Sequence, residues 1–510
     1  MKLLTTDQAK QLDHVAINKH LIPGESLMGN AGIAIAKQAL LMIQNISKPT
    51  ILIVCGKGNN GGDGFATAIE LFKNNYSIHI HSIPLEPNIN GDALVYFKEC
   101  MKYEIPITFG YEIPVIDSPS LIIDGILGIG FKGSLSDELK QWVYYVNQLK
   151  SKVLAIDIPS GLNGNSGLPD PIAINADITV TLGAIKLGML LRNGPKYCGK
   201  IILDHIGFPK LAKIKFEGMD WNTISENMVK QVLKKPKLDA NKYSSGKVLI
   251  ISGSKGMTGA AILATYGALR SGAGLTLTTA PSSLNLIYES NIIEGLILSL
   301  EDNNKGYLND AHFDLIMENV KWADSILIGP GLGRNKSTIK LIKNLVSSID
   351  KPMILDADGL FPYIDSLSDL NQKKTPIIIT PHFGEFSYLT GNDNHRIITK
   401  FSEVIKSSIE NFNHTILLKQ IPVCTINKNE VVVNTTGNPG MATAGTGDVL
   451  AGIIAGLVAQ GINTFTAAML GAFIHGKASD ELLSSKGFRG QIASDILEKI
   501  PLVMSEYEKL

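Results

Sequence analysis

The stretch TILIVCGKGNNGGDGFATAIELFKNN, residues 50–75, decides the fold of the first half of the chain. A short apolar run leads into a glycine-rich loop, and an amphipathic helical pattern follows that loop. This order is typical of the first strand and helix of a βαβ unit. Gly56, Gly58 and Gly61 also match the G-x-G-x-x-G fingerprint, in which glycines let the backbone approach a pyrophosphate at a helix N-terminus.

The same loop carries Asn59, Asn60 and Asp63, which a phosphate cradle does not need. In the cofactor fingerprint, an acidic residue at the end of the second strand binds the ribose. The predicted second strand, residues 77–83, has no acidic residue at its end before Glu86, which already lies in the next loop. The standard binding of a dinucleotide cofactor is therefore not supported. Taken alone, the glycines indicate a tight strand-to-helix turn equally well.

Outward from this stretch, β-branched runs alternate with helical patterns through the whole chain. Strands are expected at residues 50–55, 77–83, 121–126, 153–159, 177–182, 201–205, 247–254, 275–280, 325–330, 352–360, 376–382 and 415–420. The alternation predicts two α/β domains with mostly parallel sheets. The pattern decays into Lys-, Pro- and Asn-rich sequence in the middle. We expect a first domain at residues 1–212, a linker with the start of the second domain at 213–245, and a second domain within 225–510.

Composition excludes several classes of protein. Among 510 residues, Lys+Arg and Asp+Glu balance at 47 each, so we expect no nucleic-acid partner. Four dispersed cysteines fit a reducing compartment, and the N-terminus lacks the apolar core of a signal peptide, so a cytoplasmic location is expected. The apolar run 449–459 is too short to span a bilayer, so no membrane association is expected. A homo-oligomer is expected because symmetric oligomers are common.

Polar residues follow several predicted strands of the first half. Asp124 ends one strand, and Asp157 and Ser160 follow another. Ligands of open α/β sheets bind beyond the carboxyl ends of the strands, so these residues predict a site, although a single Asp there is often a turn former. Asn60, Asp124 and Ser160 are hard oxygen donors of low total charge. They favour a monovalent or hydrated cation over zinc.

In the second half, AGTGD leads directly into the apolar run 449–459. Gly445, Thr446 and Gly447 would expose backbone N–H groups at a helix N-terminus, which predicts an anion site. Asp448 is either a helix cap or, because a carboxylate would repel a bound phosphate, a base in phosphoryl transfer. The loop lacks the GK[ST] of a Walker A motif.

Three other groups in the second half have less specific patterns. His382 and Glu385 form an H-x-x-E pair without further ligands at suitable spacing, so we expect His382 to make a polar contact and not to bind metal. Asp356 and Asp358 are expected as turn formers. Lys419 follows a strand and either meets a phosphate or is a solvated surface lysine.

The motifs of the first half resemble the NAD(P)H-hydrate epimerase family over about 210 residues. They are LMGNAG (27–32), GKGNNGGDG (56–64), GDA (91–93), DGILGIG (124–130) and DIPSGL (157–162). The resemblance implies a Rossmann-like three-layer α/β domain, a potassium ion on Asn60, Asp124 and Ser160, and Asp157 as candidate acid–base residue. It implies that the hydrated dinucleotide contacts Asn59, Asn60, Gly61, Gly62, Asp63, Gly128, Ile129, Gly130, Phe131, Lys132, Gly133, Ser134 and Asp157. Gly29 departs from the family, which usually has Glu there.

The motifs of the second half resemble the ADP-dependent NAD(P)H-hydrate dehydratase family of the ribokinase-like α/β superfamily. They are GMTGAA (256–261), GPGLG (329–333), LDADGL (355–360), TPHFGE (380–385), LLK (417–419) and TGNPGMATAGTGDVLAG (436–452). The resemblance implies that Ala261, Gly331, His382 and Asp448 contact the hydrate, with Asp448 as the catalytic base. It implies that ADP, with magnesium, is bound by Lys419, Gln420, Ile421, Pro422, Val423 and Gly447. Gln420 and Ala444 depart from the family, which commonly has Gly at both positions.

Together the two resemblances imply repair of NADH and NADPH that have gained water at C6, here written NADHX and NADPHX. The first domain would interconvert the R and S epimers. The second would dehydrate the S form at the expense of ADP, releasing AMP and phosphate. One alternative is a ribokinase-like kinase for a vitamin or sugar alcohol with a ligand-sensing first domain. Another is a first domain that binds its ligand without catalysis.

Overall fold

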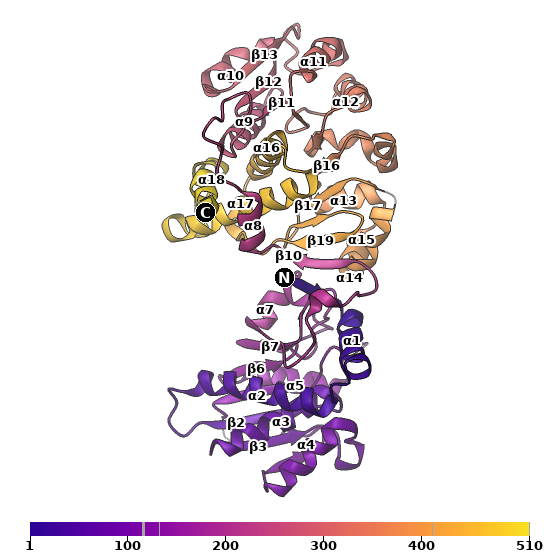
Figure 1. Cartoon of the computed structure of the whole chain (residues 1–510), viewed down its shortest axis with the longest axis vertical. Helices are drawn as coiled ribbons and strands as arrows, with labels where there is room; N and C mark the ends of the chain where they lie inside the picture. Colours follow the sequence, from indigo (N-terminus) through magenta and orange to yellow (C-terminus); the bar gives the residue numbers. More distant parts are fainter. Residues whose placement is uncertain (115–117, 132, 411, 509–510) are drawn as a thin grey trace. The chain divides into compact units, whose positions relative to one another are not determined.

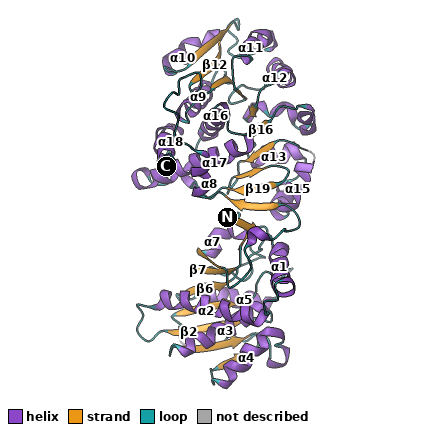
Figure 2. Ribbon diagram, in the orientation of Figure 1, coloured by secondary structure: helices purple, strands orange, loops and turns teal. Residues whose placement is uncertain are grey.

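The computed structural model describes residues 1–114, 118–131, 133–410 and 412–508 (Figure 1). The chain forms two compact units. The N-terminal unit comprises Lys2–Trp221 with Thr399–Ser402, and the C-terminal unit comprises Asn222–Ile398 and Glu403–Leu510 together with Met1. In each unit, helices flank a sheet (Figure 2).

The N-terminal unit contains a seven-stranded sheet in the order β4-β3-β2-β5-β6-β7-β9, with every neighbouring pair parallel. Its strands are β2 (Thr50–Cys55), β3 (Ser77–Ser82), β4 (Ile107–Phe109), β5 (Leu121–Gly125), β6 (Lys152–Ile156), β7 (Ile178–Leu182) and β9 (Lys200–Asp204). The order runs outward in one direction from β2 and in the other from β5. The boundary between these two strands is therefore the topological switch point, where such sheets bind ligands.

Both faces of this sheet are buried, because successive residues of a strand point to opposite faces. Ile51 and Ile53 of β2 join a core with helices α2 (Gly24–Ile43), α3 (Asn59–Lys73) and α4 (Gly91–Lys102). Leu52 and Val54 join a second core with α5 (Asp137–Gln148), which contributes Trp142. The predicted Rossmann-like three-layer α/β fold is confirmed.

The glycine loop is shorter than the sequence pattern indicated. Helix α3 begins at Asn59, so most of the predicted loop forms the first turns of the helix. A side chain on Gly61 would place its Cβ 2.0 Å from the carbonyl oxygen of Gly56. The glycine is therefore required for close packing of the helix start on the preceding turn, a contact that periodicity does not reveal.

Helix α2 is the one helix among the described residues that is long and apolar enough to cross a membrane by length and composition. Half of its most apolar window is buried in the protein. Ala31 and Ile35 on that buried side belong to the same core as β2 and α3. In this structure α2 packs as a core helix of the N-terminal unit.

The first strand and helix of the chain are anchored beside strand β8. Strand β1 (Lys2–Leu4) pairs in parallel with β8 (Ile185–Lys186), with Leu4 opposite Lys186. Helix α1 (Thr6–His14) follows at once, and Thr5 and Gln8 form a capping box at its start. This short strand therefore fixes α1 near the polar end of β8.

In the C-terminal unit, nine described strands are adjacent in the order β13-β12-β11-β14-β15-β16-β17-β18-β19. They are parallel up to β17, and β18 and β19 add as an antiparallel hairpin. Their bounds are β11 (Lys247–Ile251), β12 (Leu275–Pro281), β13 (Leu296–Leu300), β14 (Ser325–Ile328), β15 (Met353–Leu355), β16 (Ile377–Ile379), β17 (Thr415–Leu418), β18 (Cys424–Ile426) and β19 (Glu430–Val433).

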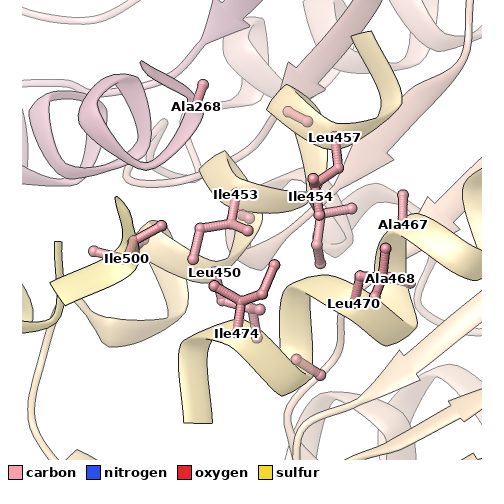
Figure 3. Packing of buried hydrophobic residues seen from close by; sticks show 14 of the residues in the cluster. Ala268, Leu450, Ile453, Ile454, Leu457, Ala467, Ala468, Leu470, Ile474 and Ile500 are labelled. Atoms are coloured by element: carbon pink, nitrogen blue, oxygen red, sulfur yellow. The ribbon is translucent and has the colours of Figure 1, made fainter. Parts of the chain in front are cut away.

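Four helices pack on one face of this sheet: α9 (Thr258–Arg270), α16 (Thr446–Ala459), α17 (Thr464–Lys486) and α18 (Ala493–Tyr507). Figure 3 shows Ile453 and Ile454 of α16 at the centre of this packing. A Cβ on Gly452 would lie 2.1 Å from the carbonyl oxygen of Ala264, so α16 and α9 approach closely. The predicted burial of the apolar run 449–459 is confirmed.

The chain contains one further strand and nine further α-helices among the described residues. They are β10 (Asp220–Thr223), α6 (Leu187–Leu190), α7 (Gly194–Cys198), α8 (Glu226–Val232), α10 (Asn285–Asn291), α11 (Phe313–Val320), α12 (Lys336–Ser348), α13 (Phe383–Thr390), α14 (Asn394–Thr399) and α15 (Phe401–Glu410).

Candidate functional site

The switch point of the N-terminal sheet brings together the three predicted cation ligands. Ser160 donates from Oγ to Asp124 Oδ1 over 2.6 Å and from its backbone N–H to Asp124 Oδ2 over 2.8 Å. Asn60 Nδ2 donates to the carbonyl oxygen of Leu127 over 2.9 Å, and Leu127 N–H donates to Ser160 Oγ over 2.8 Å. The three side chains therefore surround the loop that starts after β5.

Asp124 is fully buried, and burial raises its pKa to about 6 although the hydrogen bonds from Ser160 act in the opposite direction. In the part of the chain that the structure describes, its hydrogen-bond partners are neutral donors and no ammonium or guanidinium pairs with it. A buried carboxylate without a cationic partner is costly unless a cation lies nearby. The donor set of a carboxylate, a hydroxyl and amide oxygens fits a hard monovalent cation.

A cavity of about 640 Å³ opens beside these residues. It is lined by predicted substrate-binding residues from the start of α3, the loop after β5 and the end of β6. These residues are Asn59, Asn60, Asp63, Gly128, Ile129, Gly130, Phe131 and Asp157. A cavity of this size is sufficient for a nucleotide-sized ligand.

The other predicted contacts lie elsewhere. Gly61 and Gly62 are buried in α3 and do not line this cavity. Gly133 lines a neighbouring hollow of about 270 Å³, and Ser134 donates from Oγ to Asp170 Oδ1 over 3.1 Å. Lys132 lies outside the described residues.

Asp157 stands at the end of β6 with a positive φ of 63°, a region that non-glycine residues rarely adopt. Its Oδ1 accepts a hydrogen bond from the Leu182 N–H over 3.0 Å and forms an ion pair with Lys186 Nζ. Lys186 is 2% exposed and also donates to Thr181 Oγ1 and the Leu182 carbonyl oxygen, each over 3.0 Å. These contacts fix the Asp157 carboxylate in one position.

Sequence reasoning missed Lys186. The signal was a lysine within the apolar run AIKLGML, where a buried lysine needs a carboxylate partner. It also missed Asp13 of α1, which lines the same cavity. Burial raises the pKa of Asp13 to about 6, with a further increase from Asp157 and an opposing effect from Lys186. Burial, Asp157 and Asp13 likewise hold the pKa of Asp63 well above its usual range.

The second predicted catalytic residue, Asp448, lies in the first turn of α16. Gly445 precedes this helix with a φ of 88°, and no side chain caps the helix there. Among the described residues Asp448 makes no side-chain hydrogen bond, so it does not act as a cap. Burial raises its pKa to about 6, with Asp356 raising it further and Lys419 opposing.

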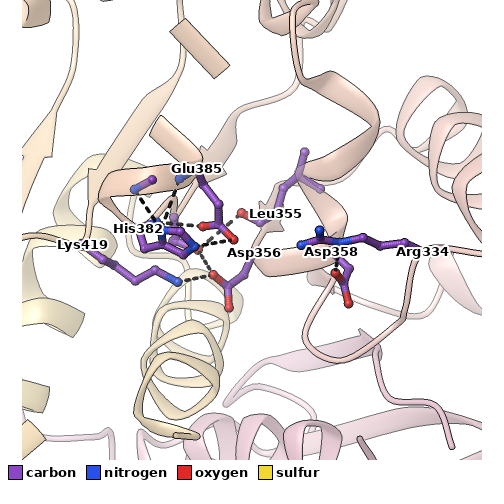
Figure 4. A network of polar contacts seen from close by, with 9 residues as sticks. Arg334, Leu355, Asp356, Asp358, His382, Glu385 and Lys419 are labelled. Carbon is purple, nitrogen blue, oxygen red and sulfur yellow. Dashed lines mark hydrogen bonds and ion pairs between the residues drawn. The ribbon is translucent and has the colours of Figure 1, made fainter. Parts of the chain in front are cut away.

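Lys419 and Asp356 form a second buried pair (Figure 4). Lys419 Nζ lies 2.6 Å from Asp356 Oδ1, which also accepts from Thr380 Oγ1 over 2.7 Å. Burial acts to lower the pKa of Lys419, but the charge of Asp356 outweighs it and the pKa is raised. The turn-former interpretation of Asp356 and the surface alternative for Lys419 are therefore wrong, since the two residues form a buried ion pair.

The ammonium of Lys419 also lies beside the start of α16. A Cβ on Gly447 would be 3.5 Å from Lys419 Nζ. Two of the predicted ADP-binding residues are thus adjacent, one supplying a positive charge and the other a backbone N–H at a helix N-terminus. In the following loop, Gln420 Oε1 is buried without a hydrogen-bond partner among the described residues, and the Ile421–Pro422 peptide bond is cis. Val423 is half-buried against the C-terminal core.

His382 caps helix α13. Its Nδ1 accepts hydrogen bonds from the N–H groups of Gly384 and Glu385 over 3.0 and 3.2 Å, while Glu385 Oε2 accepts from the His382 N–H over 2.8 Å (Figure 4). The expected polar contact is therefore a capping box. No group of three or more His, Cys, Asp or Glu side chains suitable for a metal occurs within the described ranges.

The remaining predicted hydrate contacts of the second half lie in helix α9 and in the glycine turn after β14. Ala261 is buried in α9, and Gly331 follows β14 with a φ of 63°. A Cβ on Gly331 would be 2.9 Å from the Ala260 side chain, so Gly331 and the start of α9 are in contact. Nearby, Asp358 accepts from the Gly333 N–H and from Arg334 Nε, each over 2.9 Å.

Comparison with known protein families matches both halves of the chain. Residues 248–502 match the family described as NAD(P)H-hydrate dehydratase, and residues 24–188 match the family described as YjeF-related protein N-terminus. The two matched regions fall in the C-terminal and N-terminal units respectively.

Individual relatives match over the full length. The bifunctional NAD(P)H-hydrate repair enzyme Nnr of Moorella thermoacetica is 32% identical, with 100% of this chain and 98% of that protein covered. The enzyme of the same name from Dictyoglomus turgidum is 33% identical, with 99% of each chain covered. Among solved structures, a ribokinase-like superfamily protein of Enterococcus faecalis aligns with a TM-score of 0.50 and 26% identity, covering 58% of this chain and 99% of that one. This alignment confirms the ribokinase-like fold predicted for the second half.

Proposed function

The chain belongs to the family of bifunctional NAD(P)H-hydrate repair enzymes, and on that premise we propose how its two sites divide the work. The cavity at the switch point of the N-terminal unit epimerises R- and S-NAD(P)HX. The start of α16 in the C-terminal unit binds S-NAD(P)HX and ADP and regenerates NAD(P)H, with AMP and phosphate as the other products. We assign the epimerase to residues 1–212 and the dehydratase to residues 225–510, with 213–245 as linker and start of the second domain.

The observation that carries the dehydratase proposal is the free carboxylate of Asp448 beside the Lys419 ammonium. Hydroxide is a poor leaving group, whereas phosphate is a good one that the ring nitrogen lone pair can expel. Asp448 accepts the proton of the C6 hydroxyl as that oxygen attacks the β-phosphorus of ADP. Lys419 and the N–H groups of the first turn of α16 neutralise the phosphate charge. ADP enters as its magnesium complex, so the metal belongs to the co-substrate.

In the second site we propose that Ala261, Gly331, His382 and Asp448 contact the hydrate. Lys419, the loop Gln420–Val423 and Gly447 contact ADP. In support, a Cβ on Gly447 would lie 3.5 Å from Lys419 Nζ, so the positive charge of Lys419 is close to the start of α16. Gln420 Oε1 is buried and lacks a hydrogen-bond partner among the described residues, and we propose that it gains one when the loop Gln420–Val423 binds the adenine nucleotide.

In the first site we propose that Asp157 is the acid–base residue and that Asn60, Asp124 and Ser160 hold potassium. The buried Asp124 carboxylate, with only neutral partners within the described residues, supports a cation there. Potassium would neutralise this charge and hold the loop after β5. Substrate then contacts the cavity-lining residues of α3 and that loop, and we extend the contact set to Gly61, Gly62, Lys132, Gly133 and Ser134 from the family resemblance. We further propose a cytoplasmic homo-oligomer without nucleic-acid or membrane partners.

Separated epimers test the division of labour. S-NADHX with ADP should recover the absorbance of reduced nicotinamide, and R-NADHX should do so only after conversion by the first site. ATP is compared with ADP in the same assay. If S-NADHX is not restored by either nucleotide while a vitamin or sugar alcohol is phosphorylated by ATP, the kinase alternative is correct. If Asp157→Ala does not slow R-to-S conversion, the first unit only binds its ligand.

A further inference from the structure

Asp13 is a carboxyl group that the proposed function has not yet used. It lies at the end of α1 and lines the same cavity as Asp157, Asp63 and Lys186. It makes no hydrogen bond or ion pair within the described residues. Its carboxyl group is therefore available to a ligand in the cavity, whereas Asp157 is held by Lys186 and the Leu182 N–H.

The charged groups around the cavity explain why Asp13 and Asp157 differ. The charged side chains that line it are Lys10, Asp13, Lys57, Asp63, Asp92, Asp157 and Lys186. Among the described residues only Lys186 is paired directly with one of these carboxylates, and its partner is Asp157. Burial and, to a smaller extent, the negative charge of Asp157 raise the pKa of Asp13 to about 6, against the opposing effect of Lys186. A carboxyl group with such a pKa both donates and accepts protons near neutral pH.

Resting on the epimerase function proposed above, we propose that Asp13 is a second catalytic residue of the first site and shares proton transfer with Asp157. Epimerisation at C6 must remove a substituent from one face of the ring and return it to the other. A carboxylate fixed by an ion pair can exchange a proton on only one face of the ring. A second carboxyl group, carried on a different element of the same cavity, exchanges the proton on the other face.

The chemistry balances without a further reactant. Asp13 gives its proton to the C6 hydroxyl, the C6–O bond breaks, water leaves, and the lone pair of ring nitrogen N1 forms the C6=N1 bond of an iminium ion. Water then attacks C6 from the opposite face and forms a new C6–O bond. Its proton passes to Asp157, and the C6=N1 electron pair returns to N1. One water is released and one is taken up in each turnover. Before the next turnover in the same direction, Asp157 loses its proton to solvent water and Asp13 takes one up from it, and in the reverse reaction Asp157 donates and Asp13 accepts.

Asp63 does not fill this role. It lines the cavity, but burial and the charges of Asp157 and Asp13 keep its pKa well above the usual range. A carboxyl group that holds its proton more strongly than usual is better suited to donating a hydrogen bond than to passing a proton back and forth. Asp63 therefore suits binding, in agreement with its place in the predicted contact set.

Asp13→Asn tests the proposal, with His14→Gln as the matched control, since His14 is the exposed neighbour of Asp13 on α1 and does not line the cavity. Conversion of R- to S-NADHX is followed without ADP, after subtraction of the spontaneous rate. We expect kcat for epimerisation to fall about 100-fold or more in Asp13→Asn with KM little changed, and to be unaffected in His14→Gln. ADP-dependent dehydration of S-NADHX should be unchanged in both, and the urea unfolding transition of the N-terminal unit should match that of the wild type, which together show that both units fold.

Two further measurements distinguish catalysis from support of the fold. In water enriched in the heavy oxygen isotope, the S product of the wild type should carry the label at C6, and Asp13→Asn should lose labelling and epimerisation together. The epimerisation rate of the wild type should change with pH around pH 6. Asp13→Glu should retain part of the wild-type epimerisation rate. Epimerisation at the wild-type kcat in Asp13→Asn, or epimerisation without label, overturns the proposal. A wild type that does not epimerise at all refutes the proposed function of the unit instead.

Discussion

The two carboxylates proposed to be catalytic in this protein are held in opposite ways. Asp157 follows a parallel strand, adopts a positive φ and is paired directly with the buried Lys186. Asp448 stands in the first turn of a helix without a hydrogen-bond partner among the described residues, and the nearby Lys419 is paired with Asp356 instead. At Asp448 the nearby ammonium is paired elsewhere, so it lowers the basicity of the carboxylate less than direct pairing would, whereas at Asp157 the direct pair fixes the position of the carboxylate.

The two glycine-rich helix starts also differ, in the space that surrounds their glycines. At the start of α3, a Cβ on Gly61 would meet the Gly56 backbone at 2.0 Å. At the start of α16, a Cβ on Gly447 would meet only the Lys419 ammonium, at 3.5 Å. The first glycine is needed for packing, whereas the second has room for a methyl group at van der Waals distance.

Asp448→Asn should have the largest effect. Loss of the base should lower kcat for dehydration by about 10²- to 10⁴-fold while epimerisation is unchanged. Absorbance recovery from S-NADHX with ADP measures the first rate, and R-to-S conversion measures the second. Near wild-type dehydration by Asp448→Asn would mean that this carboxylate is not the base.

Lys186→Met tests the direct ion pair of the first site. It leaves the Asp157 carboxylate buried without its partner, which should cost about 3–5 kcal/mol of local stability. Hydrogen exchange of the amides of β6 and β7 measures this loss in the N-terminal unit alone. The matched control is Lys140→Met, which removes an exposed pair with Asp137 and should leave the protection of these amides nearly unchanged, because solvent screens exposed ion pairs. Equal protection in the two variants would show that the buried pair does not stabilise the fold.

Gly61→Ala and Gly447→Ala compare the two helix starts. The methyl group at Gly61 should destabilise the N-terminal unit by about 1–3 kcal/mol, because backbone must shift to accommodate it. The methyl group at Gly447 fits at van der Waals distance, so stability should be retained while the KM for ADP rises. Urea unfolding monitored separately in each unit, together with ADP titration, measures both. A Gly447→Ala variant with unchanged KM would place ADP away from α16.

The smallest expected effect is on the pH dependence of dehydration. Asp448 must be ionised to act as base, and its pKa is raised to about 6. The rate should therefore fall as pH decreases through 6, by about tenfold at pH 5. An acidic limb centred near the ordinary pKa of an aspartate would contradict the role of burial at this site.

Stability must be followed over the same range of pH. Burial lowers the pKa of His475 to about 4, so the folded state binds a proton less readily than the unfolded state, in which a histidine has its ordinary pKa of about 6.5. Its stabilising contribution is complete above pH 6.5 and is lost as pH falls toward 4. A His475→Gln variant removes this titration, and the limb assigned to Asp448 should remain.

Local patterns were sufficient for much of the architecture. The strand at residues 50–55, the buried helix at 449–459 and the family of each half follow from apolar runs, glycine spacing and ordered motifs, and the structure and comparisons confirm them. The start of α3 at Asn59 was missed, because successive glycines are ordinarily read as a loop and only the contact of Gly61 with Gly56 explains their place in a helix.

By itself, the amino-acid sequence determined the two α/β domains, their order and the position of the proposed catalytic carboxylates at strand and helix ends, because these depend on periodicity and turn residues within short windows. Only the tertiary structure decided the electrostatics of the sites. Lys186 is 29 residues from Asp157, and Lys419 is 63 residues from Asp356. Which charges meet depends on which strand ends lie side by side, and no local pattern contains that information. The same holds for Asp13, which reaches the cavity because β1 pairs with β8.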